Sequence, residues 1–408
     1  MTTPRSPEDS SHNPLFELPE PDADAQAHSE RLIARIAEDI HASGGRISFA
    51  RYMELALFAP GLGYYSAGSQ KFGEQGDFVT APEISPLFSR ALARQIGEVL
   101  AEITAGDVSD ADVLEVGGGT GTMAAEILAE LENQGKLPQR YLILELSADL
   151  QARQRETLTA RVPHLIERVQ WLTELPKAGF RGVVVANELL DALPVHCFVT
   201  TDKGVQERFV TFQKGRFQWG AIEENPEALP LPSHLSAFVA GMPSGYASEI
   251  NTAASGWVQS IANCLDTAVV FLIDYGYAAH EYYHPRRNRG TLMCHYRHRA
   301  HDDPFVYPGL QDITAHVDFT AIAEAAVASA LEVRGYNTQG FFLLGCGITE
   351  LVQPHESLSE KQQILQAQQM RTLTLPAEMG ERFKVIALAR NYDAPLRGFT
   401  LQDLRHQL

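Results

Sequence analysis

The chain has 408 residues, of which 45% are hydrophobic and 21% charged, and 51 acidic against 33 basic side chains give a formal net charge of -18. This length allows two or three domains, and the composition excludes disorder as the dominant state because enough apolar surface can be buried to offset the ordering entropy. The acidic balance disfavours a partner held chiefly through its phosphates, so we expect no nucleic-acid partner.

The N-terminal segment and the apolar runs predict neither export nor membrane insertion. Residues 1–27 hold six acidic side chains and one arginine and have no apolar run, unlike a secretory signal or an Arg-rich transit peptide. The longest strongly apolar runs, such as 268–273, fall far short of the roughly 20 residues of a spanning helix. The four cysteines lack the paired spacing of a disulfide scaffold or zinc knuckle. We therefore expect a cytoplasmic protein with a disordered tail over residues 1–27.

The first part of the chain predicts three helices. Apolar residues recur at helical spacing from Ser29 to about Ser43, and a second helix begins near Ser48 and ends before residue 60. Ser85 can cap a third helix whose first turn accepts Pro86. We assign residues 28–105 to an N-terminal helical cap.

Short buried strands then alternate with helices, which is typical of parallel βαβ units covered on both faces of the sheet. The rhythm breaks after residue 194 into hairpin-like alternation and a Pro-rich stretch, and it resumes near residue 266. The strands are expected at residues 113–116, 141–144, 168–171, 182–186, 268–274, 331–336 and 383–389. The sequence thus predicts an α/β fold with a seven-stranded open sheet. After the helical cap, the chain is divided into a first core part (106–194), a substrate-side insertion (195–265), a second core part (266–395) and a C-terminal tail (396–408).

A glycine-rich loop follows the first of these strands, with the spacing E-x-G-x-G-x-G from Glu115 to Gly121. Glycines let the backbone turn sharply from strand to helix and let a ligand approach where a Cβ would collide, although an ordinary turn can also be rich in glycine. The dinucleotide fingerprint would place Gly or Ala at position 122, where the chain has Thr122. The candidate contacts in this loop are Glu115, Gly117, Gly118, Gly119, Thr120 and Gly121.

An acidic residue ends the next strand. Glu145 stands about 20–25 residues after the loop, where a carboxylate can bind the two hydroxyls of a ribose, or can merely lead into a helix in solvent. Together with the loop it predicts a nucleoside-type cofactor, and Leu146 beside it is a further candidate contact. Trp171, near the end of the third strand, either stacks on an adenine ring or is a core tryptophan.

Five motifs in order resemble the MidA-like methyltransferases over residues of about 30 to 390. They are residues 76–85 (GDFVTAPEIS), 115–122 (EVGGGTGT), 186–194 (ANELLDALP), 274–277 (DYGY) and 309–319 (GLQDITAHVDF). The second resembles motif I of class I methyltransferases that use S-adenosylmethionine (SAM). The resemblance implies the Rossmann-like class I methyltransferase sheet and SAM as cofactor. The family includes the mitochondrial complex I assembly factor that methylates an arginine of the quinone-site subunit. The resemblance therefore implies a protein substrate of the kind that a respiratory-complex subunit represents. The acidic tail, in place of a transit sequence, suggests a bacterial member.

The first motif leads into the helix that Ser85 caps. Free backbone N–H groups and the helix dipole favour an anion there, and the carboxylate of the methionine moiety is a candidate. Asp77, Thr80, Pro82 and Glu83 are the expected contacts. The alternative is a conventional helix cap that binds nothing.

The third motif stands at the carboxyl edge of the sheet, where ligands of such sheets bind. Methyl transfer from a sulfonium requires alignment, exclusion of water and the right protonation state of the nucleophile. A guanidinium is protonated near neutrality, and Glu188 and Asp191 can present two carboxylates to its donors. Asn187 is a candidate for both substrate and cofactor binding. These acids can instead be a helix cap and a dipole partner.

The last two motifs leave alternatives open. Asp274 either helps to hold substrate or steadies a loop. His298 and His316 occupy motif positions, so either can meet the substrate or be structural, and we include His298 among the catalytic candidates. The basic segment 286–299 suits substrate or partner binding. No metal site is expected, because the spacing of the histidines at 295, 298 and 301 suits a metal only on a helix and 291–294 has the pattern of a strand.

The leading hypothesis is a SAM-dependent methyltransferase that, by resemblance, methylates arginine in a protein belonging to a larger assembly. The alternatives are an acceptor that is a small molecule or RNA, which only the basic segment 286–299 supports, and a non-catalytic SAM-binding assembly factor. A dinucleotide oxidoreductase ranks last because Thr122 departs from its fingerprint.

Overall fold

The computed structural model describes residues 18–66, 80–106, 110–222, 231–352 and 359–408. Its centre is a sheet of eight strands, seven of which lie in the order β16-β17-β11-β5-β2-β3-β4, with β15 paired to β11. The seven are β2 (Asp112–Val116), β3 (Tyr141–Leu144), β4 (Val169–Leu172), β5 (Phe180–Asn187), β11 (Leu265–Tyr277), β16 (Glu332–Thr338) and β17 (Phe383–Arg390), and β15 is Val317–Asp318. The predicted seven-stranded α/β sheet is therefore confirmed, with one short strand added.

The order of the strands creates a switch point between β2 and β5. From β2 the chain runs outward through β3 to β4, whereas β5 and β11 extend the sheet in the other direction, and these five strands are parallel. β17 is antiparallel to both of its neighbours. In open sheets of this kind the carboxyl ends of the strands at the switch point border a crevice. Gly117 and Glu188 directly follow the two strands there.

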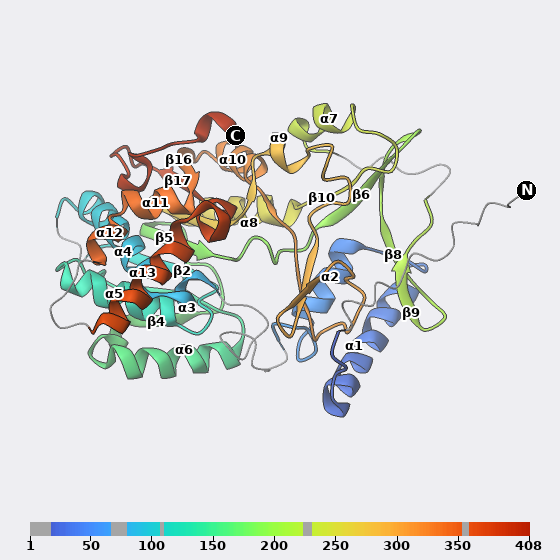
Figure 1. Ribbon diagram of the computed structural model, residues 1–408, viewed down its shortest axis with the longest axis horizontal. Coiled ribbons are helices and arrows are strands. Elements are labelled where there is room, and N and C mark those ends of the chain that lie inside the picture. The colour runs from blue at the N-terminus through green and yellow to red at the C-terminus, as the bar shows by residue number, and fades with distance from the viewer. Residues whose placement is uncertain (1–17, 67–79, 107–109, 223–230, 353–358) are drawn as a thin grey trace, which may run out of the picture.

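Helices cover both faces of the sheet because the strands carry apolar residues on both sides. One face is covered by α4 (Pro86–Ile103), α5 (Thr122–Asn133), α6 (Ala148–Arg161), α11 (Gln339–Gly345), α12 (Ile348–Leu351) and α13 (Glu360–Thr374). The other face is covered by α8 (Thr252–Cys264) and α10 (Phe319–Ala328). Figure 1 shows this sheet and its helices at the left end of the long axis.

A second body of structure faces the carboxyl edge of the sheet, at the right of Figure 1. Helices α1 (Ala23–Ala42) and α2 (Phe49–Phe58) share a core here with three small sheets, and Ile36, Tyr52, Val210 and Cys294 are buried in it. The small sheets contain β1 (Ile47–Ser48), β6 (His196–Thr201), β7 (Gly204–Glu207), β8 (Phe209–Gln213), β9 (Arg216–Trp219), β10 (Ala247–Ile250), β12 (Met293–Tyr296), β13 (Arg299–His301) and β14 (Asp312–Thr314). Of the remaining short helices, α3 (Ala81–Ile84) packs against α4 and α5. Helices α7 (Ser233–Val239) and α9 (Ala279–Tyr282) share a smaller core of their own with β6 and β10.

Several element boundaries differ from those expected. The first helix begins at Ala23 rather than Ser29, because Asp22 accepts the Ala25 N–H and caps the helix there. Residues 23–27, expected to belong to a disordered tail, are therefore helical, and residues 1–17 lie outside the described part. Helix α8, expected in the insertion, packs on the sheet through Val258 and Ile261. Helix α4 packs on the sheet, whereas α1 and α2 pack with the small sheets.

The C-terminal residues 396–408 are packed against the rest of the protein. Leu396 and Phe399 are buried. The Asn337 amide donates to the carbonyl oxygens of Gly398 and Gln402 at 3.3 and 2.8 Å. All four cysteines are buried and free. Within the described ranges no helix is long and apolar enough to cross a membrane.

Candidate functional site at the switch point

The glycine loop between β2 and α5 depends on left-handed backbone. Gly117, Gly119 and Gly121 have φ of 73°, 50° and 83°, a region that favours glycine. A Cβ on Gly118 would lie 3.0 Å from the Ile143 side chain, whereas a Cβ on Gly119 would meet no atom within 4 Å. The loop is thus packed against the protein at Gly118 and open at Gly119, where a ligand can approach the backbone.

Glu115 is buried directly beneath this loop. Its Oε2 accepts a hydrogen bond from the Tyr141 hydroxyl at 2.6 Å, and its Oε1 is buried with no partner among the described residues. Burial raises the pKa of Glu115 to about 7, against the effect of the Tyr141 hydrogen bond, and the charge of Glu145 adds to the rise. A buried carboxylate oxygen without a partner is costly unless a donor reaches it, so it favours a bound group or an ordered donor here.

Gln154 joins the loop to the next two strands, and sequence reasoning missed it. Its amide nitrogen donates to the Gly119 carbonyl at 3.0 Å and to Glu145 Oε2 at 3.2 Å, and its amide oxygen accepts from the Trp171 indole at 2.9 Å. Glu145 Oε1 also accepts the Ser147 N–H at 2.9 Å. Burial raises the pKa of Glu145, and these hydrogen bonds oppose the rise. A lone glutamine on a helix gives no signal of such a role in the sequence.

Trp171 and Leu146 lie beside this network. The Arg155 guanidinium lies 3.9 Å from the centroid of the Trp171 ring, and the indole N–H is used by Gln154. The tryptophan therefore packs between the sheet and α6, and its stacking on an adenine stays a prediction. Leu146 is 79% exposed next to Glu145, where an apolar side chain is available to a ligand.

The segment that precedes α4 approaches both the loop and the third motif. Glu83 accepts a hydrogen bond from Thr120, whose hydroxyl lies 2.9 Å from that of Thr122. Thr80 is the first residue before α3 and Pro82 is buried in its first turn. Asp77 lies outside the described residues.

Ser85 caps the start of α4, where an anion is expected from the sequence. Ser85 Oγ accepts the Leu87 N–H at 3.2 Å and donates to Gln369 at 3.1 Å. The carboxylate that reaches this segment is that of Glu188, whose Oε1 accepts the Ala81 N–H at 3.3 Å. Ser85 is therefore a helix cap, and the binding of an anion at this end of the helix stays a prediction.

Glu188 is held in an uncommon backbone conformation after β5. Its φ is 51°, in the left-handed region that costs about 1–2 kcal/mol for a residue with a Cβ. Its N–H donates to the Ile273 carbonyl at 2.9 Å and its Oε1 accepts from Asn187 at 3.1 Å. Burial, reinforced by the charges of Asp191 and Asp312, raises the pKa of Glu188 to about 8, and the hydrogen bonds from Asn187 and Ala81 oppose the rise. Such strain and such a shift are typical of functional sites.

Asp191 and Asp274 have different roles in spite of their proximity. Asp274 accepts the backbone N–H groups of Leu190 and Tyr275, both at 2.9 Å, so it steadies the turn after β5 and has little capacity for substrate. Asp191 Oδ2 accepts the Tyr275 hydroxyl at 2.6 Å, and its Oδ1 is buried without a partner in the described ranges. Burial raises the pKa of Asp191 to about 6, against the effect of Tyr275. The Asn187 Oδ1 is also buried and unpartnered among these residues.

Tyr65 and Asp312, from the second body of structure, lie on the side that faces these acids. The Tyr65 hydroxyl, just beyond α2, donates to Asp312 Oδ1 at 3.0 Å, and Asp312 is buried at the start of β14. Both Asp312 and Asp191 raise the pKa of Tyr65, after its burial. The exposed Phe58 ring stacks on Tyr65 at 5.5 Å between centroids. Nothing in the sequence pairs Tyr65 with Asp312, because only the tertiary structure brings α2 and β14 to the sheet edge.

The two histidines of the later motifs have separate positions. His298 is exposed and has a φ of 61° at the two-residue turn between β12 and β13. In the described part of the chain it has no hydrogen bond or ion pair with the acidic cluster, which consists of Glu188, Asp191 and Asp312. His316 lies against the cluster, because its ring packs edge-on to Tyr275 at 5.0 Å and stacks on Tyr277 at 5.3 Å. The structure therefore does not bring His298 together with the other catalytic candidates.

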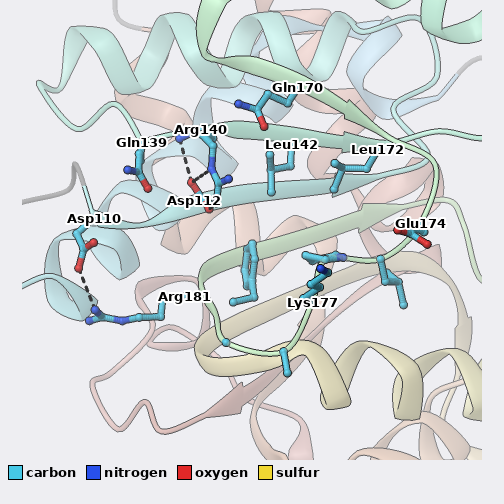
Figure 2. Close-up of a pocket in the computed structure, with 15 residues that line it drawn as sticks. Asp110, Asp112, Gln139, Arg140, Leu142, Gln170, Leu172, Glu174, Lys177 and Arg181 are labelled. Atoms are coloured by element: carbon cyan, nitrogen blue, oxygen red, sulfur yellow. Dashed lines mark hydrogen bonds and ion pairs between the residues drawn. The ribbon is translucent and has the colours of Figure 1, made fainter.

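Another cleft lies at the opposite edge of the sheet (Figure 2). It has a volume of about 530 Å³ and lies near the amino ends of β2, β3 and β5. Its charged groups are largely paired with one another: Arg140 binds Asp112 at 2.5 Å and Arg181 binds Asp110 at 2.9 Å. It has neither the glycine loop nor the unpartnered acids of the switch point. We therefore place the candidate site at the switch point.

The sheet order, the glycine loop and the acidic strand ends together define a class I methyltransferase fold with a nucleoside-type cofactor site. Residues 91–337 match the family model described as "Putative S-adenosyl-L-methionine-dependent methyltransferase", and the chain belongs to this family. The resemblance to MidA-like methyltransferases and the assignment of SAM as cofactor are thereby confirmed.

Known proteins resemble this chain over most of its length. "Protein arginine methyltransferase NDUFAF7, mitochondrial" of Mus musculus is 30% identical over 85% of this chain and 81% of its own. The crystal structure of a "likely methyl transferase from Burkholderia thailandensis bound to S-adenosyl-homocysteine" is 45% identical, with a TM-score of 0.88, covering 96% of this chain and 100% of its own. A native crystal structure of an uncharacterized protein from the same bacterium has the same identity and coverage and a TM-score of 0.86.

Proposed function

We propose that this protein methylates a guanidinium nitrogen of an arginine side chain in a protein substrate. The observation that carries the proposal is the cluster of Glu188 and Asp191 with Asn187, whose Oδ1 is buried without a hydrogen-bond partner among the described residues. Among the described residues no ion pair joins Glu188 or Asp191 to a Lys or Arg. Buried acceptors without a cation suit a ligand with several N–H donors and a positive charge, which a guanidinium supplies. The name of the mouse relative supports the same acceptor.

The residues around the glycine loop fit SAM. The open space at Gly119 admits a ligand against the backbone, Glu145 stands where a carboxylate can bind ribose hydroxyls, and the bare Oε1 of Glu115 can accept from a donor. Thr80, Pro82 and Glu83 border the same space through the contact of Glu83 with Thr120, and Leu146 and Trp171 are its apolar candidates. When bound, SAM supplies an electrophilic methyl group, and its transfer to arginine releases one proton.

Glu188 is assigned as the acceptor of that proton. A guanidinium is a poor nucleophile, so a carboxylate must orient it and take up its proton as the nitrogen–carbon bond forms. A group with a pKa of about 8 is well matched to this task near neutrality. Asp191, oriented by Tyr275, and Asn187 would hold the other donors of the guanidinium and localise its positive charge away from the reacting nitrogen.

The decisive experiment is incubation of the protein with methyl-labelled SAM and a lysate of its source organism, followed by peptide mass spectrometry. We expect label on arginine in a small number of proteins, and its loss with Glu188→Gln. Label confined to RNA or to small molecules would refute the arginine acceptor. SAM binding without any labelled product would favour a non-catalytic assembly factor. A role in complex I assembly, implied by the family resemblance, is supported if the labelled protein is a respiratory-complex subunit.

A further inference from the structure

We define the acceptor site as Asn187, Glu188 and Asp191, the residues proposed to hold the guanidinium. Positive side chains from two distant segments of the chain border this site. We define the cationic rim as Arg287, Arg382 and Lys384. All three charges act on His316, and together with burial they lower its pKa to about 4. Arg287, which follows α9, and Lys384, at the start of β17, both lie over the ring of Tyr277, and Arg382 stands two residues before Lys384. Such a gathering is notable in a chain of net charge -18.

A continuous chain of contacts connects the rim to the acceptor site. The Arg287 guanidinium lies 3.7 Å from the centroid of the Tyr277 ring, and the Lys384 ammonium lies 5.4 Å from it. Tyr277 stacks on His316 at 5.3 Å with an interplanar angle of 8°, and His316 packs edge-on to Tyr275. The Tyr275 hydroxyl donates to Asp191. Three aromatic rings, those of Tyr277, His316 and Tyr275, thus separate the rim from Asp191.

The negative groups at the rim neutralise only part of its charge. Glu281 lies 3.8 Å from Arg287, both at least partly exposed, which makes this a weak pair. Lys384 is buried, and its ammonium donates to the backbone carbonyl of Glu381. Burial lowers the pKa of Lys384, and the charges of Glu281 and Glu381 oppose this shift. Arg382 has no ion pair among the described residues. Arg287 and Arg382 are therefore the two cations of the rim that a ligand can reach, since Lys384 is buried. The His316 Nδ1, between the rim and the acceptor site, is buried without a partner in the described structure.

We propose that the cationic rim binds a carboxylate of the same protein substrate, so that the enzyme selects arginines with an acidic residue close by in the folded or extended substrate. This inference rests on the proposed function, since it specifies the class of substrate that the site accepts. Positive and negative surfaces placed side by side favour a partner with the opposite pattern and suppress partners that carry further positive charge. An arginine flanked by glutamate fits both parts of the site, whereas one flanked by lysine meets repulsion at the rim.

The test measures binding of two labelled peptides in the presence of S-adenosyl-homocysteine. The peptides share one central arginine and differ only in flanking glutamates or lysines. We expect the wild type to bind the glutamate peptide about tenfold more tightly at low salt, and the difference to shrink at high ionic strength. In the Arg287→Ala/Arg382→Ala double variant the preference is expected to disappear. Arg153→Ala, which removes a partly buried arginine that pairs with Asp149 on α6, should leave it unchanged.

Two results would overturn the inference: equal binding of both peptides to the wild type, or a preference that survives in the double variant. Because Arg287 packs on Tyr277, Arg382→Ala alone is the second variant, and it should reduce the preference about twofold to fivefold without changing the melting temperature. Failure of the proposed function gives a different pattern. In that case the glutamate peptide binds through the rim, yet its arginine never receives label from SAM.

Discussion

Glu188 Oε1 accepts a hydrogen bond from the backbone N–H of Ala81 at 3.3 Å, although 107 positions separate the two residues. This contact joins the segment before α4 to the turn after β5. With the left-handed φ of Glu188 and its bond to Ile273, it fixes the direction of the carboxylate at the switch point. A strained residue held from three sides can keep its geometry through a reaction cycle.

Replacement of this carboxylate tests the proposed mechanism. Glu188→Gln keeps the size and the capacity to accept from Ala81, but it cannot take up the proton that methyl transfer releases. We expect kcat to fall by about 10²–10⁴-fold, the usual contribution of general base catalysis, with SAM affinity unchanged by calorimetry. Full activity in this variant would remove Glu188 from the catalytic residues.

The pH dependence of the unfolding temperature of the same variant, Glu188→Gln, serves as its folding control. The pKa of Glu188 rises from 4.5 to about 8 on folding, so the folded state holds its proton more tightly and the wild type loses stability as pH increases through this window. Glutamine does not ionise, so the variant does not lose this stability as pH increases. Glu188→Gln should therefore unfold at the same temperature as wild type near pH 4 and at a higher temperature at pH 8, by an amount corresponding to about 1–3 kcal/mol.

The pH profile of the wild type provides an independent measurement. If Glu188 must be a carboxylate to accept the proton, kcat/KM rises with pH, is half-maximal near the pKa of about 8 and levels off above it. The profile should be measured over a range in which the protein stays folded by circular dichroism. A kcat/KM that stays constant between pH 6 and 9 would contradict this role.

Two glycines offer a matched test of the cofactor site. Gly119 and Gly135 have φ of 50° and 65°, and a Cβ on either would meet no atom within 4 Å. Alanine at each position should cost about 1 kcal/mol of stability from backbone strain. Only Gly119→Ala places a methyl group where SAM is proposed to approach, so calorimetry should show SAM affinity lowered at least tenfold in that variant alone. Equal SAM binding by both variants would place the cofactor elsewhere.

Gln154 is predicted to support the loop through three hydrogen bonds. Gln154→Leu leaves the Gly119 carbonyl, Glu145 and the Trp171 indole without this partner, and it should lower the free energy of unfolding by about 1–3 kcal/mol and weaken SAM binding. Gln151→Leu on the same helix removes one bond, to the Glu145 carbonyl, and is the control. Denaturant unfolding and calorimetry measure both effects. Identical behaviour of the two variants would exclude a special role for Gln154.

Tyr275 is expected to orient Asp191 toward the acceptor. Tyr275→Phe removes the donor at 2.6 Å and should reduce kcat/KM for the protein substrate by about tenfold or more, as expected for a hydrogen bond to a charged group. SAM affinity should be unchanged. Tyr52→Phe also deletes one buried tyrosine hydroxyl, which donates to Pro304 at 2.8 Å away from the acids, and should leave kcat/KM near wild type. If both variants lose activity equally, the effect of Tyr275 is one of general stability.

The sequence by itself determined the sheet and the position of its ligand edge. Periodicity located the buried strands, and strand ends carry Glu115, the glycine loop, Glu145 and Glu188 because parallel strands place their carboxyl ends at one edge. These inferences depend on local spacing, which a single chain records directly. The same spacing could not separate the roles of Asp191 and Asp274.

Only the tertiary structure decided what lies opposite that edge. Tyr65 and Asp312 meet across 247 positions, and His298 is separated from the site while His316 is brought against Tyr275. Gln154 acquires its role because α6 packs beneath the loop. Contacts of this kind arise from the packing of elements that are remote in the chain, and no periodic pattern specifies them. The acidic acceptor site and its cationic rim are therefore properties of the folded protein.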